Sequence, residues 1–197
     1  MTKLIKRFGI TLLVIIVLFA LFISIPQAIF AYQLIGKKMI GGIRNRYFYF
    51  DSSVTGYWST PYYNAVNSWY NTNTYYAFAE TSNINSSQVD MYTYEANDNN
   101  NGYTTFWKTT GSQLYVGEDD WKFCQVFLNK TNLSGTTTAY DSGVVAHELG
   151  HTCGLHENNS NVNTIMCQAA YGRAVTTPQT DDCNGINYLY PTGYYNP

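Results

Sequence analysis

The sequence has few charged residues, and they are unevenly distributed along the chain. Of its 197 residues, 11 are lysine or arginine and 13 are aspartate or glutamate, together 12% of the chain, about half the ~25% of an average protein. Residues 1–46 contain no acidic residue and seven basic ones, whereas residues 47–197 contain all 13 acidic residues and the other four basic ones. The second part is therefore strongly acidic. Because phosphates attract basic surfaces, we do not expect it to bind nucleic acid.

The sequence also lacks internal repeats of ~20–50 residues, which excludes solenoids and propellers. A disordered chain is excluded by composition, because 17% of the residues are aromatic. The acidic part has about 150 residues, the size of one ordinary domain. We therefore expect a basic leader followed by a single domain.

The leader has the pattern of an export signal. Three basic residues (Lys3, Lys6 and Arg7) precede an uncharged apolar run over residues 8–25. As a helix at ~1.5 Å per residue this run spans ~27 Å, close to the ~30 Å hydrocarbon core of a bilayer. Basic residues before such a run keep the N-terminus cytoplasmic, so the domain is predicted to be extracytoplasmic.

Two forms of the leader remain open. The apolar run is longer than the ~7–15 residues usual for a signal peptide, and cleavage after Ala28 or Ala31 would place Pro26 or Ile29 three residues before the cut. Residues 1–31 are therefore either a signal-anchor that holds the domain at the membrane or a signal peptide whose removal secretes it. Residues 32–46, with three glycines among basic residues, are predicted to be a linker.

Sequence patterns in the domain predict strands first and helices later. Strands are expected at 47–51, 74–79, 89–94, 114–116 and 124–128, a loop at 97–102, and helices at 64–71, 142–152 and 181–189. Such an order is typical of an α+β domain.

All three histidines of the chain lie in residues 147–156, within the segment H-E-L-G-H-T-C-G-L-H-E (147–157). On a helix, His147 and His151 are about 40° apart around the axis, so both imidazoles can bind one cation. Glu148 lies about 60° beyond His151, better placed for a water molecule than for ligation. This spacing is that of the H-E-x-x-H motif of zinc hydrolases, and it predicts a catalytic Zn²⁺ with Glu148 as general base.

Gly154 lies on the same side of this helix, where a glycine can adopt a positive φ, end the helix and turn the chain back. Here the sequence resembles the metzincin zinc peptidases, whose pattern is H-E-x-x-H-x-x-G-x-x-H followed by a Met-turn. The positions that match in place are His147, Glu148, His151 and Gly154.

The third ligand departs from the family pattern. Its position falls on Glu157, where the family commonly has histidine, and His156 lies one residue earlier. Either Glu157 binds the metal in the family register, or a loop shorter by one residue brings His156 to it. We expect Glu157, because zinc accepts carboxylate oxygen and no change in loop length is needed.

Two downstream segments extend the resemblance. Residues 163–167 (N-T-I-M-C) are similar to the Met-turn, with Met166 as the floor beneath the zinc, and residues 180–190 (T-D-D-C-N-G-I-N-Y-L-Y) resemble the D-D-x-x-G-I-x-x-L-Y closing helix of the matrixin branch. The resemblance covers about residues 47–190 and is specific over 147–190. It implies a twisted mixed β-sheet packed by an active-site helix and a C-terminal helix.

The resemblance implies that residues 47–197 are a matrixin-like zinc metallopeptidase catalytic domain that hydrolyses peptides or proteins outside the cytoplasm. His147, His151 and Glu157 would bind the zinc. The alternative is a catalytically weak, zinc-stabilised binding module on the cell surface; the unusual third ligand favours the module, and the intact Glu148 favours the peptidase. The sequence makes no prediction of oligomeric state.

Cysteines and an acidic turn give two further hypotheses. No cysteine precedes Cys124, so a propeptide thiol that blocks the zinc is absent. Outside the cytosol the four cysteines could form two disulfides, and we expect Cys167 with Cys183 and Cys124 with Cys153. Residues 118–120 (E-D-D) could help to bind Ca²⁺, but a solvated turn is the better explanation for them.

Overall fold

The structure, a computed structural model, describes residues 32–196. The predicted signal-anchor or signal peptide, with its apolar run over residues 8–25, lies outside the described residues. Within 32–196, none of the helices combines the length and the apolar character that a membrane span requires.

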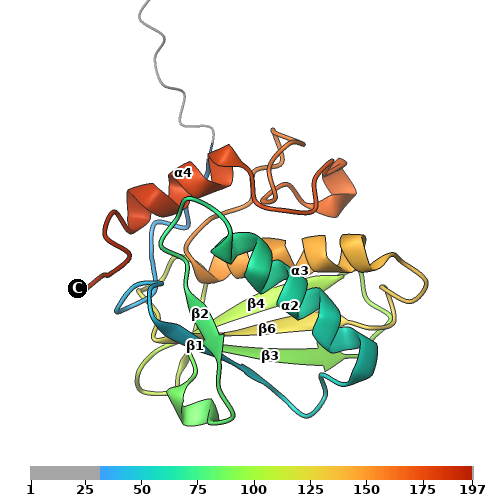
Figure 1. The fold of residues 1–197 in the computed structure, drawn as a ribbon, viewed down its shortest axis with the longest axis horizontal. Coiled ribbons are helices and arrows are strands. Elements are labelled where there is room, and N and C mark those ends of the chain that lie inside the picture. The colour runs from blue at the N-terminus through green and yellow to red at the C-terminus, as the bar shows by residue number, and fades with distance from the viewer. Residues whose placement is uncertain (1–31, 197) are drawn as a thin grey trace, which may run out of the picture. The chain divides into compact units, whose positions relative to one another are not determined.

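A six-stranded mixed sheet forms the base of the domain, in the order β2-β1-β3-β6-β4-β5 (Figure 1). Neighbouring strands from β2 to β6 in this order pair in parallel. Strand β4 runs antiparallel to both β6 and β5. The strands are β1 (Arg46–Phe50), β2 (Phe78–Glu80), β3 (Val89–Tyr94), β4 (Gly102–Trp107), β5 (Gln113–Leu114) and β6 (Phe123–Asn129).

The helices of the described part are α2 (Ser59–Tyr70), α3 (Thr138–Thr152) and α4 (Thr180–Leu189), with 3-10 turns at Gly56–Trp58, Ile84–Ser86 and Ala169–Tyr171. Figure 1 shows α2 and α3 lying side by side over the sheet, and α4 beyond them. The indole Nε1 of Trp69 in α2 donates to the carbonyl of Ala146 in α3 at 2.9 Å, which ties the two helices together. Sheet and helices together confirm the predicted α+β class at this level.

The core lies between the sheet and these helices. Alternate residues of the central strands point toward it, as the two-residue period of a strand requires. Val89 and Met91 of β3 and Cys124 and Val126 of β6 are fully buried there. The other face has a row of aromatic rings, in which Phe127 stacks between two tyrosines of the neighbouring strands at centroid distances of 4.9 and 4.6 Å. Stacking of this kind accounts for part of the high tyrosine content.

Several element positions differ from expectation: α2 and α3 begin at Ser59 and Thr138, earlier than predicted, and the strand expected at 114–116 is β5 at Gln113–Leu114. The strand expected at 74–79 is confined to β2, Phe78–Glu80. Strand β4 is not predicted, because its sequence G-Y-T-T-F-W directly follows an asparagine-rich loop and has no strong apolar alternation. Pairing with β6 along its whole length forms it instead. This strand borders the site described below.

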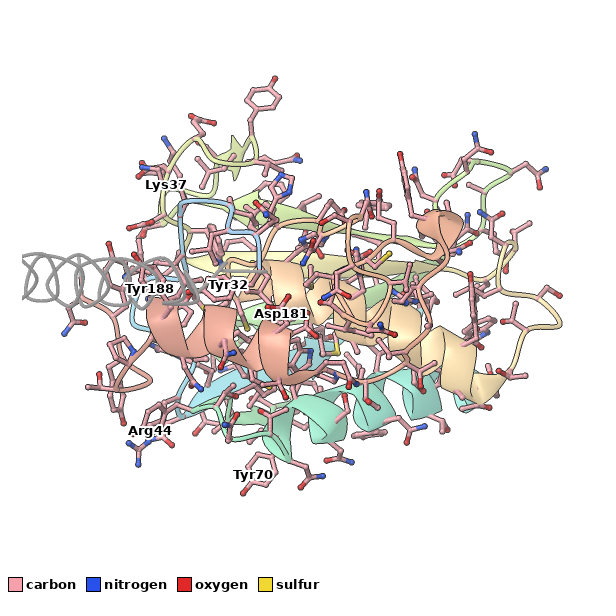
Figure 2. All side chains as sticks on the ribbon, turned by 90° about the horizontal axis from the view of Figure 1, so that it is seen from above. Tyr32, Lys37, Arg44, Tyr70, Asp181 and Tyr188 are labelled. Carbon is pink, nitrogen blue, oxygen red and sulfur yellow. The ribbon has the colours of Figure 1, made fainter. Side chains whose placement is uncertain are left out.

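Residues 32–46, predicted as a linker, are an integral part of the domain, and Arg46 is the first residue of β1. Met39 and Ile43 are fully buried, and Met39 forms a β-bridge with Trp121. Tyr32 lies beside Tyr188 of α4 (Figure 2), with ring centroids 6.2 Å apart. The glycines of this segment adopt positive φ values and provide tight turns, so composition alone mistook a turn-rich packed segment for a linker.

The predicted disulfides do not form. All four cysteines lie within the described residues as free, buried thiols. Cys183 lines a cavity with Thr72 and Pro178, whereas Cys167 lies near Arg173. The two cysteines of this expected pair therefore have different surroundings. Burial raises the pKa of Cys153 to about 12, which is the behaviour of a packed core thiol.

Candidate metal centre

Helix α3 brings the first two histidines together. The hydroxyl of Thr137 caps the helix by accepting a hydrogen bond from the backbone N–H of Tyr140, and the helix continues without a break to Thr152. His147 and His151 are one turn apart on the same face, and their Nε2 atoms are 3.2 Å from each other. The four-residue spacing thus places both side chains as the sequence predicts.

The chain turns back directly after α3. Gly154 has a φ of 98°, a value that favours glycine. A Cβ atom at this position would lie 2.8 Å from the carbonyl oxygen of Lys37 and 2.9 Å from Leu189 Cδ1, so a side chain has no room. The turn that the sequence predicts at Gly154 is therefore present, and it directs residues 155–157 back along the helix.

Glu157, not His156, joins the two histidines. Its carboxylate oxygens lie 3.3 Å from His147 Nε2 and 3.3 Å from His151 Nε2. His156 is exposed, and its backbone N–H donates to the carbonyl of Gln33. Within residues 32–196, His147, His151 and Glu157 form the one group of three or more His, Cys, Asp and Glu side chains close enough to hold a metal ion.

The spacing of the three side chains fits zinc. Ligand atoms at 2.0–2.1 Å from a tetrahedral Zn²⁺ lie about 3.3 Å apart, and the closest approaches within the group are 3.2, 3.3 and 3.3 Å. Glu157 Oε2 is buried and has no hydrogen-bond partner. An unsatisfied buried oxygen is costly, and a cation bound between the three side chains would satisfy it.

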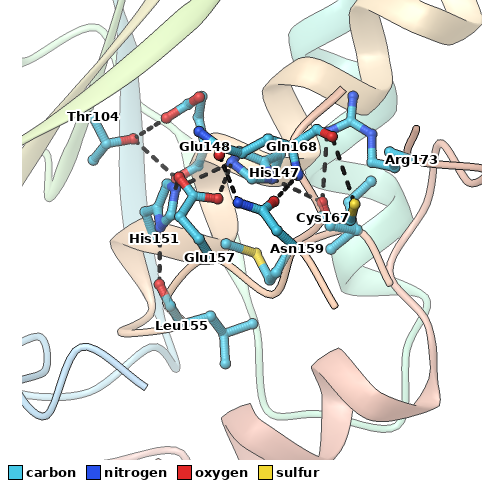
Figure 3. Close-up of polar contacts among 12 residues, drawn as sticks. Thr104, His147, Glu148, His151, Leu155, Glu157, Asn159, Cys167, Gln168 and Arg173 are labelled. Atoms are coloured by element: carbon cyan, nitrogen blue, oxygen red, sulfur yellow. Dashed lines mark hydrogen bonds and ion pairs between the residues drawn. The ribbon is translucent and has the colours of Figure 1, made fainter. Parts of the chain in front are cut away.

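Backbone carbonyls orient both imidazoles. His147 Nδ1 lies 2.8 Å from the carbonyl of Ile165, and His151 Nδ1 lies 2.9 Å from that of Leu155 (Figure 3). Each Nδ1 therefore bears the proton and donates it, which leaves the Nε2 lone pair free to face the centre of the group. Ligating histidines in metal sites commonly have such a partner.

Electrostatics also favour a cation in this position. Burial alone would lower the pKa of His151, but the carboxylates of Glu157 and Glu148 raise it to about 9. Burial acts on Glu157 in the opposite sense, yet its contacts with the two histidines hold its pKa well below the usual range. Without a metal the group thus retains a proton, and a bound cation would take the place of that proton.

Glu148 is outside the ligand group but faces the same cavity. Its side chain is buried, and the hydroxyl of Thr104 in β4 lies 2.8 Å from Oε2 and 3.1 Å from the Glu148 carbonyl oxygen (Figure 3). The cavity that it lines together with His147, His151 and Glu157 has a volume of about 250 Å³. Sequence reasoning identified Glu148 but not Thr104, which lies 44 positions away on the strand that was not predicted.

Met166, predicted as the floor of the site, packs against α3. It is buried, and a Cβ atom at Gly150 would overlap its Sδ, so this glycine allows Met166 to approach the helix closely. Asp182 of α4 holds the turn in place: it accepts hydrogen bonds from the backbone N–H of Ile165 and from the hydroxyl of Thr164. Asp182 also caps α4, because its carboxylate accepts a hydrogen bond from the backbone N–H of Gln179.

Arg173 is a further residue of the site that the sequence analysis missed. It lines a second cavity beside His147 and Glu148, and its Nη1 lies 3.5 Å from the carbonyl of Ile165. Burial lowers the pKa of Arg173, while the nearby Tyr140 and Glu148 act in the opposite direction. The guanidinium nevertheless remains a cation at any ordinary pH. No local pattern around residue 173 points to this position.

The acidic turn at 118–120 is engaged in other contacts. Glu118 and Asp119 lie 3.6 and 3.7 Å from Lys108 Nζ. Asp120 accepts hydrogen bonds from the backbone N–H of Lys38 and the hydroxyl of Tyr195. The three carboxylates are not part of the metal group, and these contacts favour the solvated-turn alternative over Ca²⁺ binding.

Comparisons with known proteins extend only to the fold. No protein-family model matches the chain, and no curated protein matches it either. Among solved structures, the chain is similar to one described as the GM1 bound form of the ECX AB5 holotoxin, with a TM-score of 0.52 and 11% sequence identity over 81% of this chain and 88% of that chain. At this level of identity the likeness concerns the arrangement of strands and helices alone.

Proposed function

We propose that the protein is a zinc-dependent endopeptidase of the metzincin type that acts outside the cytoplasm. The observation that supports this most directly is the convergence of two histidine Nε2 atoms and one carboxylate at 3.2–3.3 Å, with Glu148 facing the same cavity. The turn at Gly154 and the buried Met166 beneath α3 support the metzincin type. The basic residues and apolar run of the leader support export.

The chemistry divides between the metal group and Glu148. His147, His151 and Glu157 would hold a zinc ion, which would supply a Lewis acid for the peptide carbonyl and for water. Glu148 takes a proton from the attacking water as the water oxygen bonds to the carbonyl carbon of the peptide. The same carboxyl then gives the proton to the amine nitrogen as the C–N bond breaks. Thr104 keeps this carboxylate oriented toward the cavity through its 2.8 Å hydrogen bond.

A comparison of zinc content and activity tests the proposal. The full-length protein, loaded with Zn²⁺, should hydrolyse quenched fluorescent peptides and lose this activity with a chelator. Glu148→Gln should keep one zinc per chain and lose about 10²- to 10⁴-fold in kcat, the usual contribution of a general base. Equal inactivity of wild type and Glu148→Gln, each with one zinc bound, would refute the peptidase proposal and leave the binding module.

Neighbouring substitutions test the ligand set. Glu157→Ala should lose zinc, because it removes a ligand from the group, whereas His156→Ala should retain it, because this side chain is exposed. The two variants alter adjacent residues of the same loop, so each controls for the other. Loss of zinc in His156→Ala alone would show that the loop has the shorter register.

A further inference from the structure

A small cavity lies next to the metal group, on the side of His147. Its volume is about 120 Å³, enough for a small polar group and several times the space that one water molecule needs. Its walls come from α3, from the loop before β4 (residues 99–102) and from the segment after Met166. The side chains that matter here are those of Val144, His147, Glu148, Gln168 and Arg173.

Among the described residues, Arg173 is the only lysine or arginine that lines this cavity, and most of its donors have no partner there. A guanidinium has five N–H donors. Within the described residues, Arg173 makes a single long hydrogen bond, from Nη1 to the Ile165 carbonyl at 3.5 Å. Among the described residues, no carboxylate oxygen lies within 4.0 Å of its side-chain nitrogens. Cations that are partly removed from water are normally paired with an anion.

The two nearest carboxylates are already engaged. Glu148 and Glu157 both interact electrostatically with Arg173 across the site. Glu148, however, accepts a hydrogen bond from Thr104, and Glu157 lies between the two histidines at 3.3 Å from each. Neither reaches the guanidinium. The unpaired donors of Arg173 are therefore available to a group that enters the cavity.

We propose that Arg173 recognises a carboxylate of the substrate in this cavity. The inference rests on the proposed peptidase function, because the cavity shares His147 and Glu148 with the metal site. A carboxylate fits the guanidinium through two parallel N–H···O bonds. In a peptide it comes either from an aspartate or glutamate next to the scissile bond or from a free C-terminus close to it.

A structural role for Arg173 predicts a different result. The Ile165 carbonyl accepts from both Arg173 and His147 Nδ1, so the arginine could act only by supporting the orientation of this ligand. Removal of such a support would weaken zinc binding and slow the cleavage of every peptide by the same factor. Recognition of a carboxylate instead changes the ratio between charged and neutral peptides of the same shape.

Matched peptides separate these possibilities. One pair has Glu or Gln before the scissile bond, a second has Glu or Gln after it, and a third ends close to that bond in a free carboxylate or an amide. For the full-length zinc protein we expect a 10- to 100-fold higher kcat/KM for the charged member of at least one pair, the range of a hydrogen bond to a charged group. The pair that responds identifies the source of the carboxylate.

Variants then assign the preference to Arg173. Arg173→Gln should bring the charged-to-neutral ratio close to 1, and Arg173→Glu should reverse it in favour of a peptide with lysine at the responding position. Lys122→Gln removes one positive charge from an exposed position away from the cavity and should leave the ratio unchanged. Equal kcat/KM for all wild-type pairs, or an equal loss on all peptides in Arg173→Gln, would overturn the inference.

Binding measurements separate this inference from the proposed function. Fluorescence polarisation with the same peptides and the zinc-loaded Glu148→Gln protein requires no hydrolysis. Tighter binding of the charged peptide, lost when Arg173→Gln is added, supports the carboxylate site even if the wild type cleaves nothing, an outcome that would refute only the peptidase proposal. Equal binding of charged and neutral peptides would refute the carboxylate site alone.

Discussion

Asp90 gives a sharp test of the electrostatics of the fold, independent of the metal site. It lies in β3 between Tyr49 of β1 and Gln125 of β6, its side chain is 5% exposed, and its Oδ1 has no hydrogen-bond partner. Burial raises the pKa of Asp90 from 3.8 to about 6, although a hydrogen bond with Ser87 acts against this. An ionised carboxylate at this position therefore destabilises the folded protein.

The magnitude follows from proton linkage. A difference between 3.8 in the unfolded chain and about 6 in the folded protein amounts to about 3 kcal/mol, at 1.36 kcal/mol per pKa unit. Below pH 3.8 both states are protonated and the penalty is absent. The penalty grows as the pH rises from 3.8 to 6, because Asp90 loses its proton in the unfolded chain before it does so in the folded protein. Above this interval the penalty is constant.

Asp90→Asn removes the charge and keeps the shape of the side chain. We expect this variant to be more stable than the wild type by about 3 kcal/mol at pH 7, and by only about 0.5 kcal/mol at pH 4. The assay is urea denaturation at a series of pH values, with a chelator present so that metal binding does not vary. The free energy of unfolding of the wild type is subtracted from that of the variant at each pH.

A second aspartate provides the control. Asp119 is exposed, and Asp119→Asn removes the same charge from the surface, so its effect should stay within about 0.5 kcal/mol at every pH. If Asp90→Asn shows a difference that does not change between pH 4 and pH 7, the raised pKa is wrong. If it destabilises the protein at pH 7, the carboxylate has a stabilising partner, and the reasoning from burial fails.

Three further substitutions test how the site is held. Thr104→Val removes the hydroxyl that donates to Glu148, so kcat should fall about 10-fold, which corresponds to about 1.4 kcal/mol, while the zinc content stays unchanged. Thr104→Ser, which keeps the hydroxyl, should retain the wild-type kcat. Gly150→Ala should destabilise the zinc-free protein by about 1–3 kcal/mol in urea denaturation, because its Cβ overlaps Met166, and the loss should shrink in a Met166→Ala background. Asp182→Asn replaces an oxygen that accepts two backbone N–H groups; thermal denaturation should show a loss of about 3 kcal/mol, and an unchanged melting temperature would contradict the role given to this buried carboxylate.

Local sequence rules predicted that His147, His151 and Glu157 lie together, because local geometry places them. The four-residue spacing of His147 and His151 on one helix fixes their common face, and the positive φ of Gly154 turns the chain so that Glu157 returns to it. Each of these steps spans only a few residues. Helix periodicity and the conformational freedom of glycine are therefore sufficient to anticipate them.

The supporting residues escaped prediction because they approach from elsewhere in the chain. Thr104 reaches Glu148 only after β4 pairs with β6, and that pairing is a long-range contact with no local pattern. Arg173 lies in an irregular segment, and its place beside the metal group depends on how this segment folds against α3. The wrong prediction of a linker at 32–46 has the same cause, since the buried Met39 pairs with Trp121, 82 positions away in the sequence.

The charge of the proposed centre links the unusual third ligand to Arg173. With a divalent cation, the carboxylate of Glu157 and an ionised Glu148 leave no net charge, whereas a histidine in place of Glu157 would leave one positive charge. A less positive centre polarises a carbonyl less strongly. Arg173 returns one positive charge to the site, and it interacts with both carboxylates. The charges of Glu157 and the half-buried Arg173 therefore offset each other. A substrate carboxylate bound by Arg173 would meet a site in which the charges of the cation, Glu157 and Glu148 already cancel.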